Sequence, residues 1–315
     1  MKKWILVVII LTMLAALIYL AIPNRLQINQ TINVRVNERA FSRVFPDEGR
    51  WNSWWPKSEN KGYVQSEAPG FPFKGNIYRV IDKRLTSILI SISTGKDSLL
   101  SELLFIPSND PFMSLNWIAE MEAPSNPFER VKAFFGTKAL AKDMKIILQS
   151  LEKHYASEKN IYGLDIKKEF VQDSLLVSSF FIAEEYPGAA EIYRLVDRLK
   201  TYVARNGARQ TGAPMLNITT SDSSTYYTKV ALPVDRKLKD SGDIQYRWML
   251  GRGDILIAEV AGGTNSINNA FREMEHYVTD YRRQAPAIPF QSLVTDRRLV
   301  SDTSKWITKI CWPVM

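Results

Sequence analysis

The most continuous apolar stretch of the chain lies near its N-terminus. Residues 4–22 carry no charged side chain and directly follow Lys2 and Lys3. A helix of this length spans roughly 28 Å, close to the hydrocarbon thickness of a bilayer. Trp4 and Tyr19 stand towards its two ends, where aromatic side chains favour the membrane interface. The pattern predicts a single-pass membrane anchor within residues 1–25. Because lysines stay on the cytoplasmic side, the N-terminus is expected in the cytoplasm and the soluble part outside it.

A cleaved signal peptide is the alternative interpretation of the same stretch. Signal peptides normally have an apolar core of about 7–15 residues that ends at small residues. The run here is longer, and its end, residues 19–23 (YLAIP), is a poor cleavage site. We therefore favour the anchor. Both interpretations place the folded part outside the cytoplasm.

Alternation of apolar and polar residues after the anchor predicts a first domain over residues 26–158. Residues 26–36 alternate as a strand does, and Asn37 is suited to cap a helix after it. Four further strand-like runs follow, at 76–82, 85–93, 98–106 and 113–121. From Asn126 to about residue 157, apolar residues recur at spacings of three and four, which predicts a long helix.

A second domain is expected over residues 159–315, where the order strand, helix, strand, strand occurs twice. We expect strands at 161–171 and 174–183, a helix at 187–206, and strands at 214–219, 225–233 and 253–260, then a helix at 265–284 and strands at 291–296 and 305–312. The order indicates an internal structural repeat, although the copies are expected to share little sequence. Two such units predict one antiparallel sheet with both helices on one face and an open groove on the other. Residues 158–160 remain as a short linker between the domains.

Composition and charge narrow the functional classes. Of 315 residues, 45% are hydrophobic and 23% charged, which is typical of a globular and not a disordered chain. The expected order of strands and helices makes the fold class α+β. The net charge of +8 is spread along the chain, so no nucleic-acid partner is expected. Cys311 is the single cysteine, and His154 and His276 lie far apart in the sequence. We therefore expect no intrachain disulfide, no metal site and no cofactor.

The first domain resembles the SRPBCC (START-like) superfamily in its order of elements and in residues 36–56, VNERAFSRVFPDEGRWNSWWP. The resemblance implies a helix-grip fold, in which a curved antiparallel sheet and a long C-terminal helix enclose an apolar cavity. Trp51, Trp54 and Trp55 are candidate ligand contacts at its mouth. The alternative is that they fill the core, as clustered aromatic side chains more often do.

The second domain resembles the GyrI-like effector-binding domains, which also occur behind AraC-type regulators. Three segments carry the resemblance, residues 258–278, 289–299 and 306–314. It implies a duplicated β-α-β-β fold with a central groove for a small, often cationic or aromatic molecule. A buried carboxylate usually supplies the counter-charge in this family.

The residues of this chain depart from that pattern. Lys309 stands at the position where the resemblance implies an acid, which leaves Glu259 as the candidate carboxylate. If both face the groove, they can form an ion pair with each other, or Lys309 can favour an anionic ligand. The groove can also be degenerate. Tyr227 and Trp248 complete the candidate contacts, and neighbouring Tyr226 points to the opposite face of the strand.

The sequence thus favours a membrane-anchored protein that binds or senses a small apolar or aromatic molecule. A partner-binding scaffold with degenerate pockets is the alternative. A hydrolase of either fold is a third hypothesis, and it needs Glu259 as a buried general base. No helix-turn-helix pattern precedes residue 161, which argues against a transcription regulator.

Overall fold

The computed structural model describes residues 2–57, 70–95, 97–108, 111–172, 174–220, 225–249 and 251–315. The chain divides into two compact units, Met1–Ser157 (unit 1) and Glu158–Met315 (unit 2). Each unit holds one antiparallel sheet with helices packed on it, so the protein is of the α+β class. The two units are described separately.

Unit 1 begins with helix α1 (Lys2–Ala21), over the apolar stretch. Where side chains are described, no helix is both long and apolar enough to cross a membrane. The chain that leaves α1 is held by Arg130, which is only 3% exposed. Its guanidinium donates hydrogen bonds of 2.7 Å to the carbonyl of Ile22 and to Oδ1 of Asn24. These bonds fix the end of α1 against the rest of unit 1.

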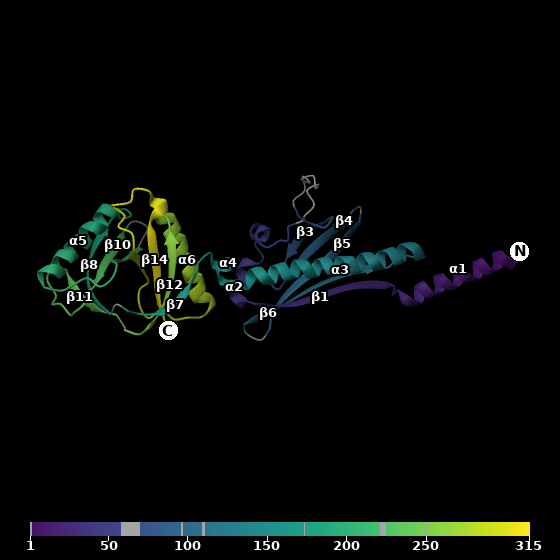
Figure 1. Cartoon of the computed structure of the whole chain (residues 1–315), viewed down its shortest axis with the longest axis horizontal. Helices are drawn as coiled ribbons and strands as arrows, with labels where there is room; N and C mark the ends of the chain where they lie inside the picture. Colours follow the sequence, from purple (N-terminus) through teal and green to yellow (C-terminus); the bar gives the residue numbers. More distant parts are fainter. Residues whose placement is uncertain are drawn as a thin grey trace. The chain divides into compact units, whose positions relative to one another are not determined.

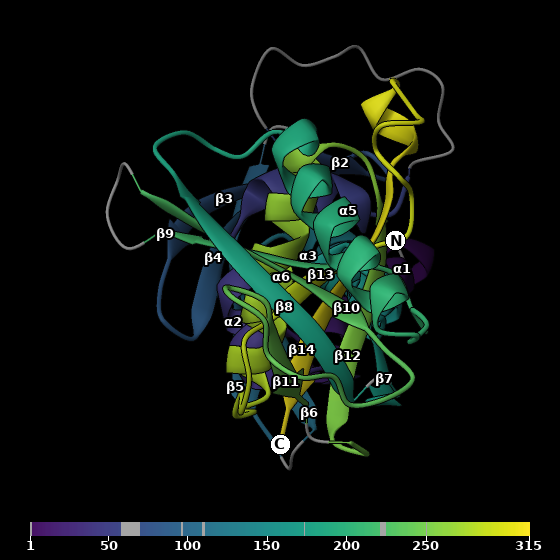
Figure 2. The ribbon, with the colours of Figure 1, turned by 90° about the vertical axis from the view of Figure 1, so that its left-hand side faces the viewer.

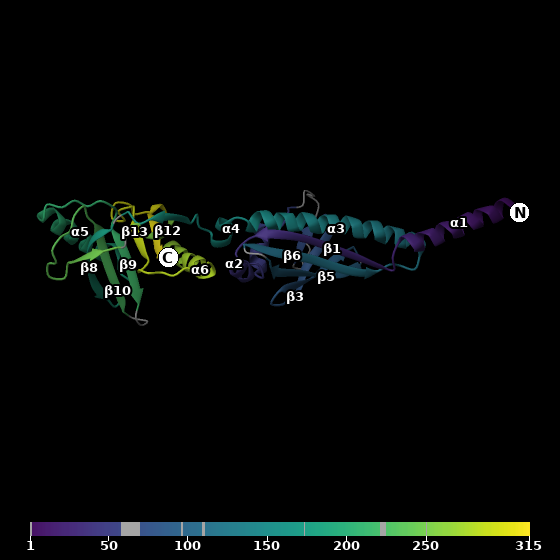
Figure 3. The same ribbon diagram turned by 90° about the horizontal axis from the view of Figure 1, so that it is seen from below.

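A six-stranded sheet in the order β1-β6-β5-β4-β3-β2 forms the body of unit 1. Its strands are β1 (Arg25–Arg35), β2 (Phe71–Phe73), β3 (Asn76–Lys83), β4 (Ser87–Thr94), β5 (Asp97–Pro107) and β6 (Phe112–Glu122). The short helices α2 (Glu38–Val44) and η1 (Glu48–Ser53) follow β1, and the long helix α3 (Pro127–Tyr155) packs against it (Figures 1 and 3). The five strands and the long helix expected from the sequence are confirmed, and β2 was missed.

Asparagine caps explain where two helices of unit 1 start. The Asn37 side chain accepts hydrogen bonds from the backbone N–H groups of Arg39 and Ala40, as the sequence predicted. Asn126 does the same for Phe128 and Glu129 at the start of α3. Such caps satisfy N–H groups that have no partner within the helix.

Unit 2 carries an eight-stranded sheet in the order β11-β8-β10-β9-β13-β14-β12-β7. Its elements are α4 (Glu158–Tyr162), β7 (Lys167–Phe170), β8 (Leu175–Ala183), α5 (Ala189–Arg205), β9 (Met215–Thr220), β10 (Tyr226–Pro233), β11 (Gln245–Trp248), β12 (Asp254–Ala261), α6 (Thr264–Asp280), β13 (Phe290–Leu293), η2 (Thr303–Lys305) and β14 (Ile307–Val314). The repeat is β8-α5-β9-β10 followed by β12-α6-β13-β14. The halves join where β9 pairs with β13.

The predicted duplicated arrangement is therefore present. Helix α5 packs on β8 and β10, and α6 packs on β12 and β14 (Figure 2). The two edge strands pair across the halves. Strand β7 precedes β8 in the chain but pairs with β12. Strand β11 precedes β12 but pairs with β8.

Three predicted boundaries in unit 2 were wrong. Residues 158–162 form helix α4, not a linker and the start of a strand, so the strand expected at 161–171 shrinks to β7. Buried Tyr162 explains this, since its hydroxyl donates a 2.9 Å hydrogen bond to Asp280. Helix α6 ends at Asp280 rather than at residue 284 because Arg282 adopts a left-handed conformation, with φ of 52°. Strand β11 was not predicted.

Candidate functional site

The face of the unit 2 sheet opposite the helices is the candidate site. Side chains alternate along each strand, so one set packs under α5 and the other points to the open face. Val177, Leu216 and Val230 belong to the first set and lie in the core with α5. Ile255, Phe290 and Cys311 belong to the second set and form a separate apolar cluster, with Met215, Met249, Val171 and Ile257 packed around them.

Two adjoining pockets hollow this open face. The first, of about 270 Å³, has an apolar floor and one charged residue, Lys229. Its lining is Leu176, Met215, Asn217, Lys229, Ala231, Trp248, Met249, Ala287, Ile288 and Phe290. The second, of about 450 Å³, lies beside Val171, Arg252, Asp254 and Pro313. Both are lined by Trp248, Met249 and Ala287, so the two pockets adjoin, and together they are called the groove below.

The charges around the groove are unevenly compensated. At the second pocket, Asp254 forms a 2.6 Å ion pair with Lys168. At the first pocket, the ion pairs found among described residues do not include Lys229. Burial raises the pKa of the nearby Cys311 thiol to about 12, so the thiol stays protonated and unreactive near neutral pH.

The structure places Glu259 and Lys309 directly opposite each other on β12 and β14. Both lie on the open face, which is the condition under which the sequence allowed them to pair, but neither lines either of the two pockets just described. Within the described residues no ion pair joins them. Glu259 is exposed, so it lacks the burial that the general-base hypothesis required.

The remaining candidates in unit 2 fall in different places. Trp248 lines both pockets while 63% of it stays exposed, which suits a side chain at the rim. Tyr227 lies on the open face opposite Ile182 but outside both pockets. Tyr226 points to the other face, where its ring packs edge-on against Tyr186 with 5.6 Å between centroids.

The three tryptophan candidates of unit 1 lie in its core. Trp51, Trp54 and Trp55 are 0%, 3% and 8% exposed. The rings of Trp51 and Trp55 stack with 6.0 Å between centroids, and the Trp51 indole N–H donates to the carbonyl of Phe45. Further aromatic neighbours complete the cluster, namely Phe41, Phe71, Tyr78, Phe105 and Tyr155. The structure thus agrees with the core alternative for these residues, while their role in ligand contact stays a prediction.

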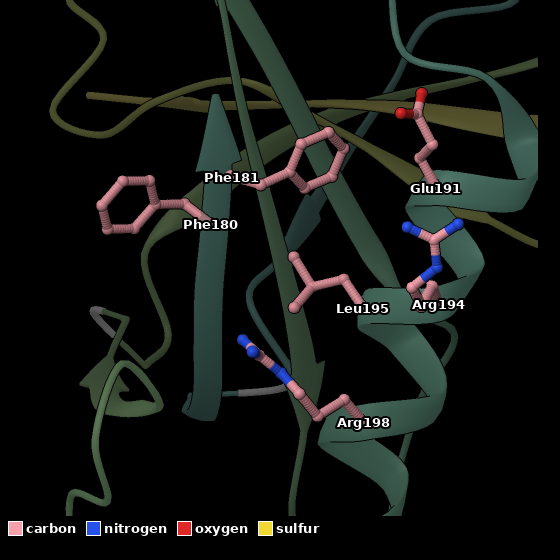
Figure 4. A pocket seen from close by; sticks show the side chains of 6 residues that line it. All are labelled: Phe180, Phe181, Glu191, Arg194, Leu195 and Arg198. Carbon is pink, nitrogen blue, oxygen red and sulfur yellow. The ribbon is translucent and has the colours of Figure 1, made fainter. Parts of the chain in front are cut away.

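A third pocket, of about 230 Å³, lies between β8 and α5 on the helix side of the sheet. Figure 4 shows Phe181 and Leu195 facing each other across it, while Phe180 points away from the helix. Arg198 crosses its edge and binds Asp243 and the hydroxyl of Ser179. Arg198 therefore already has acceptors, and Arg194 and Glu191 complete the charged lining of the pocket.

Sequence reasoning missed Lys229, although a signal for it exists. Residues 226–234 (YYTKVALPV) and 306–314 (WITKICWPV) match at four positions, where Thr228, Lys229, Pro233 and Val234 correspond to Thr308, Lys309, Pro313 and Val314. These segments are the equivalent strands β10 and β14. The expectation that the two copies share little sequence was therefore wrong for the last strand of each half, and Lys229 is the counterpart of Lys309.

Among the residues that the structure describes, no group of three His, Cys, Asp or Glu side chains is arranged to hold a metal ion.

Comparison with known proteins gives only distant structural likenesses. No protein-family profile matches the chain, and no curated protein matches its sequence. Among solved structures, the C-terminal domain of EcmrR aligns at 16% identity over 48% of this chain and 98% of that chain, with a TM-score of 0.41. A hydrolase from Listeria innocua aligns at 9% identity over 48% of this chain and 91% of its own, with a TM-score of 0.37. A START superfamily protein from Mycobacterium smegmatis aligns at 12% identity over 40% of this chain and 98% of its own, with a TM-score of 0.26.

Proposed function

We propose that the protein binds a small, largely apolar molecule in the groove on the open face of unit 2. One observation supports this proposal, namely the two adjoining pockets on this face, of which the first has a mostly apolar lining. Binding sites for small molecules are typically concave and mostly apolar, with a few polar groups that fix orientation. Met215, Met249 and Phe290 supply the apolar surface, and the half-exposed Trp248 supplies a ring at the rim.

Filling the groove tests the proposal. Ala231 lies on the floor of the first pocket, so Ala231→Phe places a phenyl ring in the space that the ligand needs. Full-length protein purified from cells is analysed by native mass spectrometry for retained small molecules. We expect a bound molecule on the natural protein and none on Ala231→Phe. Ile182→Phe is the matched control, because Ile182 is 54% exposed on the same face and outside both pockets. Equal occupancy of all three proteins, or none in any, would contradict the proposal.

A partner-binding scaffold is the second candidate function. It is favoured by exposed apolar side chains where β8 ends and β10 begins, outside the two pockets of the groove. Phe180, Ile182 and Tyr227 are 51%, 54% and 41% exposed, and Ile182 lies opposite Tyr227 on the neighbouring strand. Replacing Ile182 and Tyr227 by Ser and Thr removes this surface without touching the groove. The scaffold hypothesis predicts that an associated protein is then lost from cross-linked cells, whereas small-molecule binding predicts no change.

We further propose that residues 4–22 anchor the chain in a membrane with both units outside the cytoplasm. The support is the uncharged apolar sequence that follows Lys2 and Lys3. An anchored chain stays with membranes after alkaline extraction, and a fused C-terminal alkaline phosphatase is active. Release into the supernatant with a shortened mass would show the cleaved signal peptide instead. An inactive phosphatase would contradict both topologies.

A further inference from the structure

The internal repeat of unit 2 allows its two matching lysines to be compared in equivalent surroundings. Both point to the open face from the same position of the strand motif. Lys229 lies between Asn217 on β9 and Phe180 on β8. Lys309 lies between Ser292 on β13 and Glu259 on β12. The neighbour on the inner strand is therefore polar in both halves, whereas the neighbour on the outer strand differs in charge.

The neighbour on the outer strand determines the net charge around each lysine. Directly opposite side chains of an antiparallel pair have Cβ atoms about 5 Å apart, close enough for opposite charges to attract. Glu259 therefore places an opposite formal charge beside Lys309, although the two form no ion pair within the described residues. Phe180 supplies no such charge opposite Lys229, and ion pairs among the described residues leave Lys229 out. The cross-strand pair thus carries a formal charge of one in the first half of the sheet and none in the second.

Lys229, which has no acid opposite it on the neighbouring strands, is also the lysine that lines a pocket. Lys229 stands at the edge of the 270 Å³ pocket, whose other lining side chains are all uncharged. Lys229 is itself exposed beside an apolar floor, so it attracts an anion partly through solvent, and salt screens this attraction. A cation in the same place would meet Lys229, and no carboxylate is among the described residues that line the pocket. The charge of this lining therefore favours an anion over a cation.

We propose that this pocket takes an organic anion, with its carboxylate beside Lys229 and a compact apolar or aromatic body against Met215, Ala231 and Phe290. This assignment rests on the proposed small-molecule function and adds the class of ligand and the residue that selects it. It differs from a cation-binding groove, which needs a buried acid. Lys309, at the position where an acid was expected, has no such role, since it lines neither pocket and faces Glu259.

The test compares three probes that share one ring system, namely 2-naphthoate, 2-naphthylmethanol and (2-naphthylmethyl)trimethylammonium. Binding to the full-length protein is measured by calorimetry. We expect 2-naphthoate to bind at least tenfold more tightly than the cationic probe, and its affinity to fall as salt is raised. Lys229→Met is expected to weaken 2-naphthoate at least tenfold and 2-naphthylmethanol less than threefold.

Lys309→Met is the matched comparison, because it removes the same charge from the equivalent position of the other half. It is expected to weaken 2-naphthoate less than threefold. Equal affinity for all three probes, or equal losses in the two lysine variants, would overturn the anion assignment and leave the groove as a general apolar site. Failure of every probe to bind the natural protein would overturn both this assignment and the proposed function.

Discussion

The two halves of unit 2 carry the same strand motif and the same order of elements, yet they present different chemistry on both faces of the sheet. On the open face, Lys229 lies opposite Phe180 and takes part in no ion pair among the described residues, while Lys309 lies opposite Glu259. On the helix face, the buried hydroxyl of Thr228 has no hydrogen-bond partner, while that of Thr308 accepts a 3.1 Å bond from Arg297. The two halves thus share a fold and a strand motif, while the residues beside the motif differ between them.

The largest difference between the halves is expected at the two buried threonines. Thr308→Val removes an acceptor from the guanidinium of Arg297, which is itself largely buried and otherwise bonded to Gln291 at 2.9 Å. We expect a loss of about 2–3 kcal/mol in the stability of unit 2, because the bond is to a charged group. Thr228→Val removes a hydroxyl that has no partner, so it should leave stability unchanged or raise it. Hydrogen exchange of the β10 and β14 amides measures the stability change in each variant. Equal losses of stability in Thr308→Val and Thr228→Val would refute the difference between the two threonines.

A second difference concerns Cys311, whose counterpart in the first half is Ala231. The folded pKa of the thiol, about 12, lies above its ordinary value of 9.0. Between these values the folded state holds a proton that the unfolded state has lost, so stability falls as pH rises through the window. The slope is at most about 1.4 kcal/mol per pH unit, or about 2 kcal/mol between pH 9 and 10.5.

The matched variant for this prediction is Cys311→Ala, which makes the two halves alike at this position. Other groups also titrate in alkali, so the informative quantity is the difference between the natural protein and the variant. We expect the unfolding free energy of the natural protein to fall more steeply above pH 9. If the unfolding free energies of the two proteins fall in parallel as pH rises, burial does not raise the pKa of the thiol.

The smallest expected difference is the cross-strand coupling on the open face. A double-mutant cycle of Glu259→Gln and Lys309→Met should give a coupling of about 0.2–1 kcal/mol that shrinks in 1 M salt. The equivalent cycle of Phe180→Leu and Lys229→Met should show no dependence on salt, because Phe180 carries no charge. A salt-dependent loss of stability in the single variant Lys229→Met would reveal an acid near Lys229 and weaken the anion assignment.

Much of the fold could be predicted because apolar alternation and helix caps are local signals. Strand β1 and the caps Asn37 and Asn126 are read directly from neighbouring residues. The end of α6 could not be read, because its closing turn uses Arg282 in a left-handed conformation that usually requires glycine. The backbone N–H groups of Arg282 and Arg283 bond back to the carbonyls of Thr279 and Val278, which satisfies the end of the helix.

The remaining errors arose where burial depends on a distant partner. Residues 161–171 have the composition of a strand, but Tyr162 reaches Asp280 and packs on Tyr277, which holds the start of the segment as helix α4. Strand β11 is short and lies at a sheet edge, so its sequence carries no alternation strong enough to detect.

The candidate site was predicted only in part. The open face and the orientation of Glu259 and Lys309 follow from strand alternation. The pocket does not, because it forms where Trp248 and Ala287, from separate loops and strands, meet over the sheet. Lys229 could have been found by aligning the two halves of the second domain, since its motif repeats eighty positions later at Lys309.

The central claim is that the ligand lies in the groove of unit 2 and not in the aromatic core of unit 1. The chain has eight tryptophans, and 5-fluorotryptophan labelling gives each its own ¹⁹F NMR signal, assigned by single Trp→Phe variants of the full-length protein. On addition of 2-naphthoate we predict a shift of the Trp248 signal, with the signals of Trp51, Trp54 and Trp55 unchanged. A shift of the unit 1 signals with Trp248 unmoved would place the ligand in the other domain and contradict the account.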